Sequence, residues 1–225
     1  MVKKLEILGM ELHNYTVREA MLQVEVFLNN TIVNTIETIS MESLVRAQTD
    51  ELLKQCIESL DLVIIRDKEI LKAAGVDSAQ RIRETVENEF QKEFMKCASR
   101  NNRTVFLLGD TKERVAAFQK FLSEKYNQIK IVGTYALADC EGDYDTVNNE
   151  INIAEPDIIL SVISTPEQEY FLEENKDKLN VKVWYGMGDA ATFEKGLSEV
   201  TGFAKKLIQK GRLHSMILRY KKKSE

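Results

Sequence analysis

The chain has 225 residues, of which 44% are apolar and 30% charged, enough for one large or two small domains around a well-formed core. Its net charge of −5 argues against a general nucleic-acid-binding protein, because such domains are usually basic along one face. No apolar run approaches the roughly 20 residues that span a bilayer, and the N-terminus lacks signal-peptide features, so we expect a cytoplasmic protein. The three cysteines show no C-x-x-C spacing, so we expect neither disulfides nor a structural zinc site.

The first hundred residues predict a hairpin, several helices and two further strands. Residues 4–12 have strand character, with a bend or hairpin at Gly9. Thr16 is expected to cap a helix, and the β-branched, alternating stretch 32–38 predicts a strand that stops at Thr38. Residues 42–60 predict two helices, the second capped by Thr49 or Asp50, before a buried strand at 60–65.

The second half alternates strands and helices more plainly. One helix is expected to carry Val86, Phe90, Phe94 and Cys97 on a single face, with Cys97 and the earlier Cys56 buried. Strands are predicted at 104–108, 129–133, 157–163 and 181–185. Helices are predicted around 145–153, from Pro166 with Thr165 as its N-cap, and in the stretch that bears Val115, Phe118, Phe121 and Leu122. This alternation predicts an α/β fold: a mostly parallel sheet flanked by helices, with a Rossmann-like second half and an N-terminal hairpin and helices.

The strand ends collect polar residues and glycines. They are Thr38 and Ser40, Arg66 and Asp67, Gly109, residues 164–168 and residues 186–188. Parallel strands bring their carboxyl ends to one edge, where ligands bind in open α/β sheets. Each residue also has a simpler interpretation: Asp67 paired with Arg66 or Lys68, Thr38 and Ser40 as helix caps, and Arg81 as a solvated side chain.

The C-terminal segment is basic on an otherwise acidic chain. From residue 205 onward it holds eight basic residues, including Arg212, Arg219 and Lys222, against one acid, Glu225. Apolar residues lie among them, a pattern that favours an amphipathic helix and an anionic partner, either a phosphate group or an acidic membrane surface. A frayed, solvated end remains the alternative. We divide the chain into an N-terminal α/β half at residues 1–100, a Rossmann-like half at residues 101–200 and a basic amphipathic appendage at residues 201–225, with no linker composition between the halves.

Several segments match motifs that occur together in one enzyme family. TISMESLV is similar to T-P-N-P-E, LDLVIIRDKEIL to A-D-L-V-L-P-D-G, QRIRETV to R-V-x-G, VFLLGD to V-F-L-L-G-G, and PDIILSVISTPEQE to P-D-x-L-x-V-x-x-G-x-P-x-Q-E. The tail has Arg-Leu at 212–213 followed by basic residues seven and ten positions after Arg212. With these motifs, and an opening that looks like the family's first hairpin and helix, the chain resembles the WecG/TagA/CpsF glycosyltransferases over nearly its whole length.

The resemblance implies a function. Such enzymes transfer a hexose, typically N-acetylmannosamine, from a UDP-sugar to a polyprenyl-diphosphate-linked sugar at the inner face of the membrane, in polysaccharide or teichoic acid synthesis. The implied enzyme inverts the anomeric centre, uses neither metal nor cofactor, and associates peripherally with the membrane. Whether it forms a homo-oligomer stays open.

The resemblance also implies site residues. Asp67 falls on the proposed catalytic aspartate, which would take the proton of the acceptor hydroxyl. The substrate-binding residues that it implies are Thr38, Ser40, Arg81, Gly109, Gln168, Gly188, Arg212, Arg219 and Lys222. Arginines suit the leaving diphosphate because they make bidentate contacts.

The chain departs from the family pattern at several turns. Lys68, Asp110 and Ser164 replace glycines, Ser40 stands where Asn is usual, and Ala191-Thr192 replaces Phe-Asp. A homologue that binds a nucleotide sugar or a partner without turnover is therefore the alternative function. A Rossmann oxidoreductase is disfavoured because no G-x-G-x-x-G follows the first strand. We expect the acidic pair Asp143-x-Asp145 to lie in a solvated loop rather than in a metal site.

Overall fold

The fold is an α/β sandwich built on one parallel sheet, as the sequence predicts. The structure is a computed structural model that describes residues 3–140, 142–188, 211–213 and 215–219. Six parallel strands have the order β4-β3-β8-β7-β5-β6, and an antiparallel hairpin of β1 and β2 forms a separate two-stranded sheet. The strands are β1 Lys4–Ile7, β2 Met10–His13, β3 Asn34–Ile39, β4 Leu62–Ile65, β5 Thr104–Gly109, β6 Lys130–Ala136, β7 Ile158–Val162 and β8 Val183–Gly186.

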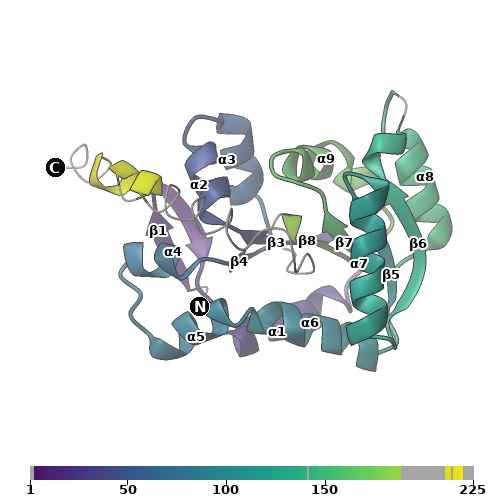
Figure 1. Ribbon diagram of the computed structural model, residues 1–225, viewed down its shortest axis with the longest axis horizontal. Helices are drawn as coiled ribbons and strands as arrows, with labels where there is room; N and C mark the ends of the chain where they lie inside the picture. The colour runs from purple at the N-terminus through teal and green to yellow at the C-terminus, as the bar shows by residue number, and fades with distance from the viewer. Residues whose placement is uncertain (1–2, 141, 189–210, 214, 220–225) are drawn as a thin grey trace.

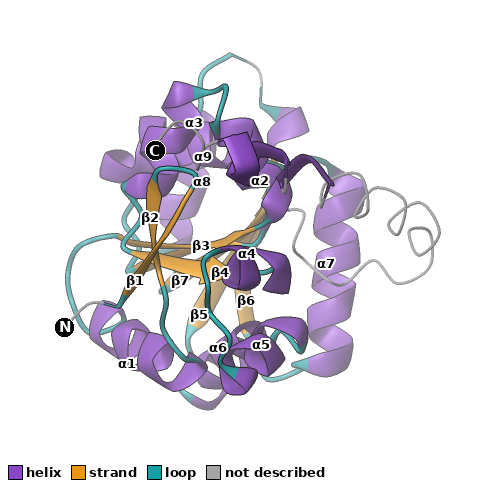
Figure 2. Ribbon diagram, turned by 90° about the vertical axis from the view of Figure 1, so that its left-hand side faces the viewer, coloured by secondary structure: helices purple, strands orange, loops and turns teal. Residues whose placement is uncertain are grey.

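Helices cover both faces of the large sheet (Figures 1 and 2). The hairpin, α2, α3, α4, α8 and α9 contribute to the core on one face, and α1, α6 and α7 to the core on the other. The helices are α1 Val17–Phe27, α2 Met41–Ala47, α3 Glu51–Glu58, α4 Lys68–Ala73, α5 Ala79–Val86, α6 Glu89–Arg100, α7 Lys112–Lys125, α8 Asp145–Ala154 and α9 Glu167–Asn175, with 3₁₀ turns η1 Leu137–Asp139 and η2 Lys176–Lys178.

Strand β8 joins the two halves of the chain into one sheet. It comes last among the strands of the described residues but lies between β3 and β7. The predicted strand at 32–38 is present as β3, and it is buried at almost every position because both faces of the sheet are covered. The strand also runs to Ile39, one residue beyond Thr38.

Capping residues in the sequence predicted two helix ends correctly. Thr16 caps α1 in a full capping box with Glu19, and Asp50 rather than Thr49 caps α3 by accepting a hydrogen bond from Leu53 N at 3.1 Å. The prediction that Thr165 is the N-cap of α9 is wrong. Pro166 occupies the position before α9, and Thr165 Oγ1 instead donates to Glu169 Oε1 at 2.9 Å.

The helix predicted to carry Val86 and Phe90 on one face is two helices. Asn88 has a left-handed backbone, with φ of 52°, which ends α5 and starts α6 in a new direction. Phe90 and Phe94 are buried as expected, but Val86 is 55% exposed and Cys97 is only half-buried. The prediction of a buried Cys56 is confirmed.

Candidate functional site

The ends of β3 and β4 bring Ser40 and Asp67 together. The two strands are paired in parallel, with Thr38 opposite Ile64, so the residues that follow them emerge side by side. Ser40 Oγ accepts a hydrogen bond from Ser43 N at 3.2 Å and caps α2. Asp67 Oδ2 accepts one from Met41 N at 2.8 Å. Both side chains therefore lie at the N-terminus of α2, where backbone N–H groups favour negative charge.

Thr38 lies in a narrow cleft with a volume of about 30 Å³, lined also by Arg66, Arg81 and Tyr185. Its hydroxyl is hydrogen-bonded to the Tyr185 hydroxyl at 3.0 Å. Burial raises the pKa of Tyr185, and its ring packs against Phe94 with centroids 4.8 Å apart. The phenol is therefore a neutral, fixed hydrogen-bonding group at the base of the cleft.

Arg81 enters the same cleft from α5 and is not a solvated side chain. It is 12% exposed. Its guanidinium donates to Asn14 Oδ1 at 3.2 Å and to Glu84 Oε2 at 3.1 Å. Glu84 is buried and also accepts hydrogen bonds from Val17 N and Gln80 Nε2. These contacts hold the guanidinium in one orientation and offset much of its charge.

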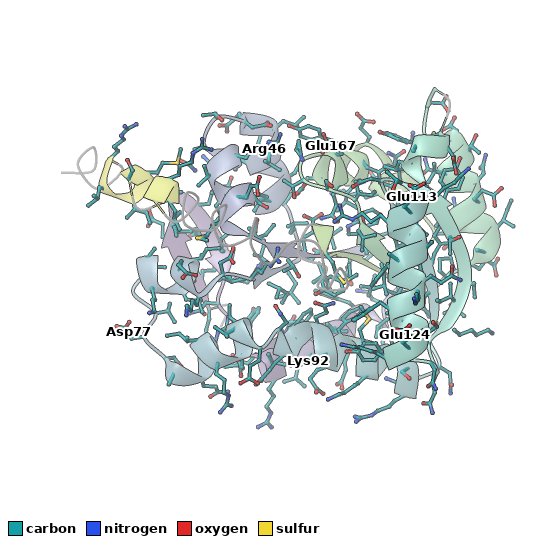
Figure 3. The ribbon with its side chains drawn as sticks, in the orientation of Figure 1. Arg46, Asp77, Lys92, Glu113, Glu124 and Glu167 are labelled. Atoms are coloured by element: carbon teal, nitrogen blue, oxygen red, sulfur yellow. The ribbon has the colours of Figure 1, made fainter. Side chains whose placement is uncertain are left out.

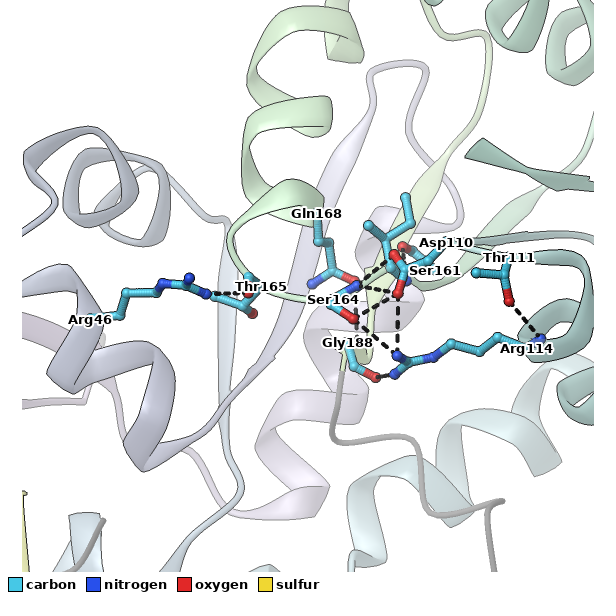
Figure 4. Close-up of polar contacts among 10 residues, drawn as sticks. Arg46, Asp110, Thr111, Arg114, Ser161, Ser164, Thr165, Gln168 and Gly188 are labelled. Atoms are coloured by element: carbon cyan, nitrogen blue, oxygen red, sulfur yellow. Dashed lines mark hydrogen bonds and ion pairs between the residues drawn. The ribbon is translucent and has the colours of Figure 1, made fainter. Parts of the chain in front are cut away.

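A polar network fills the turns after β5 and β7 (Figure 4). Asp110 accepts hydrogen bonds from Ser164 N at 2.9 Å and from Ser164 Oγ at 2.6 Å, and it pairs with Arg114 at 3.2 Å. Arg114 also donates to Ser164 Oγ and to Gly188 O, each at 3.0 Å. Two of the substituted glycine positions, 110 and 164, thus form one connected cluster.

Gln168 and Gly188 meet next to this network. Gln168 is only 1% exposed, and its Oε1 accepts a hydrogen bond from Gly188 N at 3.2 Å. Gly188 has a φ of +47°, a backbone that favours glycine. Its peptide is held on both sides, the N–H by Gln168 and the carbonyl by Arg114.

Gly109 has a packing role in this structure. A Cβ at this position would lie 2.8 Å from Val115 Cγ2 and 3.0 Å from Val162 Cγ2. The bare backbone therefore lets α7 approach β5 and β7 closely.

Arg212 and Arg219 line an open cavity of about 720 Å³ between α2 and the C-terminal segment, which also includes Arg46. Arg46 donates to Thr165 O at 2.7 Å, so this cavity borders the loop before α9 (Figure 4). Within this segment residues 211–213 and 215–219 are described, and they are docked through Leu213, which is 2% exposed and belongs to the core. Lys222 lies outside the described residues, as do Ala191 and Thr192.

The structure therefore groups the predicted residues into neighbouring sets rather than one ring. Thr38 and Arg81 share the cleft, Ser40 and Asp67 share the start of α2, and Gln168 pairs with Gly188; the cleft lining includes neither Asp67 nor Gln168. Sequence reasoning missed the roles of Arg46, Arg114 and Tyr185. Only Arg114 carried a local signal, since it follows Asp110 at the i,i+4 spacing of helix ion pairs.

In the part of the chain that the structure describes, no group of three or more His, Cys, Asp or Glu side chains is placed to hold a metal ion. Asp143 Oδ1 accepts a hydrogen bond from Asp145 N at 3.2 Å, as in an ordinary turn. Across the described ranges, no helix combines the length and apolar character needed to cross a bilayer.

Comparison with known proteins agrees with the motifs. The sequence model of the glycosyl transferase WecG/TagA/CpsF family matches residues 5–201. Proteins from Staphylococcus aureus strains NCTC 8325 / PS 47, COL and MSSA476 are each 27% identical over 192 residues, which cover 82% of this chain and 73% of theirs. Each relative is named N-acetylglucosaminyldiphosphoundecaprenol N-acetyl-beta-D-mannosaminyltransferase. From the family match over most of its length, the chain belongs to the WecG/TagA/CpsF family of glycosyltransferases.

Proposed function

We propose that this glycosyltransferase moves an N-acetylmannosamine-like hexose from a UDP-sugar to a polyprenyl-diphosphate-linked sugar in cell-surface polysaccharide or teichoic acid synthesis. One observation carries the proposal: in a member of this family, the paired ends of β3 and β4 gather Thr38, Ser40 and Asp67 at one edge of the sheet. The names of the Staphylococcus aureus relatives support a lipid-linked acceptor. The enzyme would work peripherally at the inner face of the membrane.

The chemistry proposed is a single displacement without metal or cofactor. The acceptor hydroxyl attacks the anomeric carbon of the donor sugar. The bond between that carbon and the diphosphate oxygen of UDP breaks, and the configuration at the anomeric carbon inverts. Asp67 Oδ2 is held by Met41 N, so we assign Oδ1 to take the hydroxyl proton. The departing diphosphate needs fixed positive charge, which Arg212 and Arg219 would supply with Arg46 across their shared cavity.

A second candidate is a homologue that binds the donor without turnover. The cluster of Asp110, Arg114 and Ser164 favours it, because Asp110 and Ser164 occupy turns where the family has glycines that a ligand can approach, and Arg114 in α7 binds both side chains. The two candidates differ in whether product forms.

The test is Asp67→Asn in an assay with a panel of UDP-sugars and a short-chain lipid-diphosphate acceptor. We expect kcat to fall about 10²- to 10⁴-fold while donor affinity stays nearly constant, because Asn keeps the shape but cannot accept the proton. Asp77→Asn is the matched control, since Asp77 is exposed at the outer edge of the molecule (Figure 3). Full turnover by Asp67→Asn would refute the catalytic role. Donor binding by the wild type without transfer would favour the second candidate.

A further inference from the structure

A fully buried carboxyl group lies on the central strands behind the turn that holds Gly188. Glu37, in β3, has no exposed surface. Both of its oxygens are shut off from solvent and receive no hydrogen bond of good geometry from the described residues. The nearby Trp184 Nε1 is likewise buried without an acceptor among them. Such groups cost stability, so this carboxyl needs a physical explanation.

Because Gly186 has no side chain, Glu37 and Gln168 can approach each other beside it. Glu37 is opposite Gly186 in the parallel pairing of β3 with β8. A Cβ on Gly186 would lie 2.5 Å from Gln168 Nε2 and 2.9 Å from Glu37 Cγ. The two side chains therefore occupy the space that the missing side chain leaves. While the Gln168 oxygen accepts from Gly188 N, its amide nitrogen lies on the side of Gly186 and Glu37.

The surroundings of Glu37 are mainly acidic. A small cavity of about 10 Å³ borders it, and the titratable or charged groups that line this cavity are Cys56 from α3, Glu169 and Glu173 from α9, and Lys176 from η2. Glu169 is itself buried, with 2% exposure. Burial, and then the negative charge of Glu169, raise the pKa of Glu37 well above its ordinary value, although the neighbouring N–H groups of Gln168 and Trp184 act in the opposite direction.

We propose that Glu37 is a positioning residue which, as a neutral carboxylic acid, fixes the amide of Gln168 and through it the turn at Gly188. The inference rests on the proposed function, because Gln168 and Gly188 are among the residues expected to meet the donor. A neutral acid turns an uncharged carbonyl oxygen toward the nearby N–H groups of Gln168 and Trp184, and it places no second charge beside Glu169. Ionisation would set two buried carboxylates against each other and push α9 away from β3.

The first test detects the proton directly. Infrared difference spectra at neutral pH should show a protonated carboxyl band in the wild type that Glu37→Gln lacks. Glu173→Gln is the matched control, because it removes an exposed carboxyl from the same small cavity, and it should keep the band. An identical band in the wild type and in Glu37→Gln would overturn the proposal.

The second test follows positioning. In NMR spectra, the Gln168 side-chain amide and Gly188 N–H signals of the wild type should shift as pH rises and Glu37 ionises, whereas in Glu37→Gln they should not. Glu37→Ala should lower kcat/KM on the order of ten- to a hundredfold, and Glu37→Gln should restore it near neutral pH. Unchanged Gln168 and Gly188 signals in Glu37→Ala would overturn the proposal. If that variant fails to fold, a pH response of these signals in Glu37→Gln equal to that of the wild type overturns it instead.

These readouts separate the inference from the function on which it rests. A wild-type protein that transfers no sugar contradicts the proposed function. The infrared band and the two NMR signals need no turnover, so they still decide whether Glu37 is protonated and whether it holds Gln168.

Discussion

Two glycines at the carboxyl edge of the sheet are needed for different physical reasons. Gly188 has a positive φ, which side chains disfavour. Gly109 shows no such backbone, and its constraint is space, because Val115 and Val162 close over its Cα. A motif match alone treats both as places where a ligand meets bare backbone. In the structure the Gly188 peptide is already hydrogen-bonded to Gln168 and Arg114, and Gly109 is packed against valines.

Gly109→Ala should destabilise the protein by about 1–3 kcal/mol, because the added methyl group collides with the stiff Val115 side chain and forces α7 away from β5. Urea unfolding measures the loss. The matched control is Gly211→Ala, whose added methyl group would meet nothing within 4 Å and which should leave stability unchanged or slightly raised. Equal stability of the two variants would show that α7 can move away from β5 without lowering the free energy of unfolding.

At the level of elements, helix ends decide where the site residues emerge. Asn88 turns the chain between α5 and α6, so α5 presents Arg81 to the cleft while α6 packs Phe94 beneath Tyr185. Ser40 starts α2 immediately after β3, which brings Met41 N to Asp67. The polar residues at the sheet edge therefore depend on caps and breaks as much as on the strands.

The capping box of α1 gives a prediction about pH. Hydrogen bonds from Lys3 and Thr16 lower the pKa of Glu19 to about 2 from an ordinary value of 4.5. Because the folded-state pKa is depressed, the stabilisation is present above about pH 4.5 and is lost as pH falls through about 2. Glu19→Gln should therefore cost stability at neutral pH, about 0.5–1 kcal/mol given that solvent screens this partly exposed side chain.

Denaturant unfolding at about pH 7 and about pH 3.5 measures this effect. The difference in unfolding free energy between wild type and Glu19→Gln should narrow at the lower pH. Glu25→Gln, an exposed position on the same helix, serves as control and should show little difference at either pH. A gap that stays constant or widens on acidification would contradict the assignment.

At the scale of the whole molecule, the C-terminal segment combines a side chain packed into the core with exposed apolar and basic side chains. Leu213 is packed into the core while Leu218 is 51% exposed, and Arg212 and Arg219 border the open cavity. We therefore expect docking and membrane contact to depend on different residues of one short segment. Anionic vesicles should bind the tail reversibly, since each basic residue contributes about 1 kcal/mol and salt weakens it.

Leu213→Ala should loosen the tail and increase proteolysis near it, because a buried leucine is lost. The matched change Leu218→Ala should leave the tail docked but weaken vesicle binding, because an exposed apolar side chain is removed.

Deleting residues from Arg212 onward should abolish both vesicle binding and transfer while the body stays folded. Full transfer by the truncated protein would show that the segment plays no part in catalysis.

The sequence by itself determined the alternation of strands and helices, the hairpin at Gly9, and the caps at Thr16 and Ser40. These features depend on periodicity and turn residues within a few positions, which any chain segment displays locally. It also indicated that Thr38, Ser40 and Asp67 gather at one edge, because parallel strands share that edge whatever their order.

Only the tertiary structure decided which of these ends are neighbours. Strand β8 inserts between β3 and β7, so Tyr185 meets Thr38 and the gap at Gly186 opens to both Glu37 and Gln168. The contacts of β8 with Thr38 and Glu37 join residues more than a hundred positions apart, and no local pattern encodes the order of strands. The burial of Glu37 follows from that order. Its strand has neighbours on both sides and helices over both faces of the sheet, so the carboxyl group has no path to water.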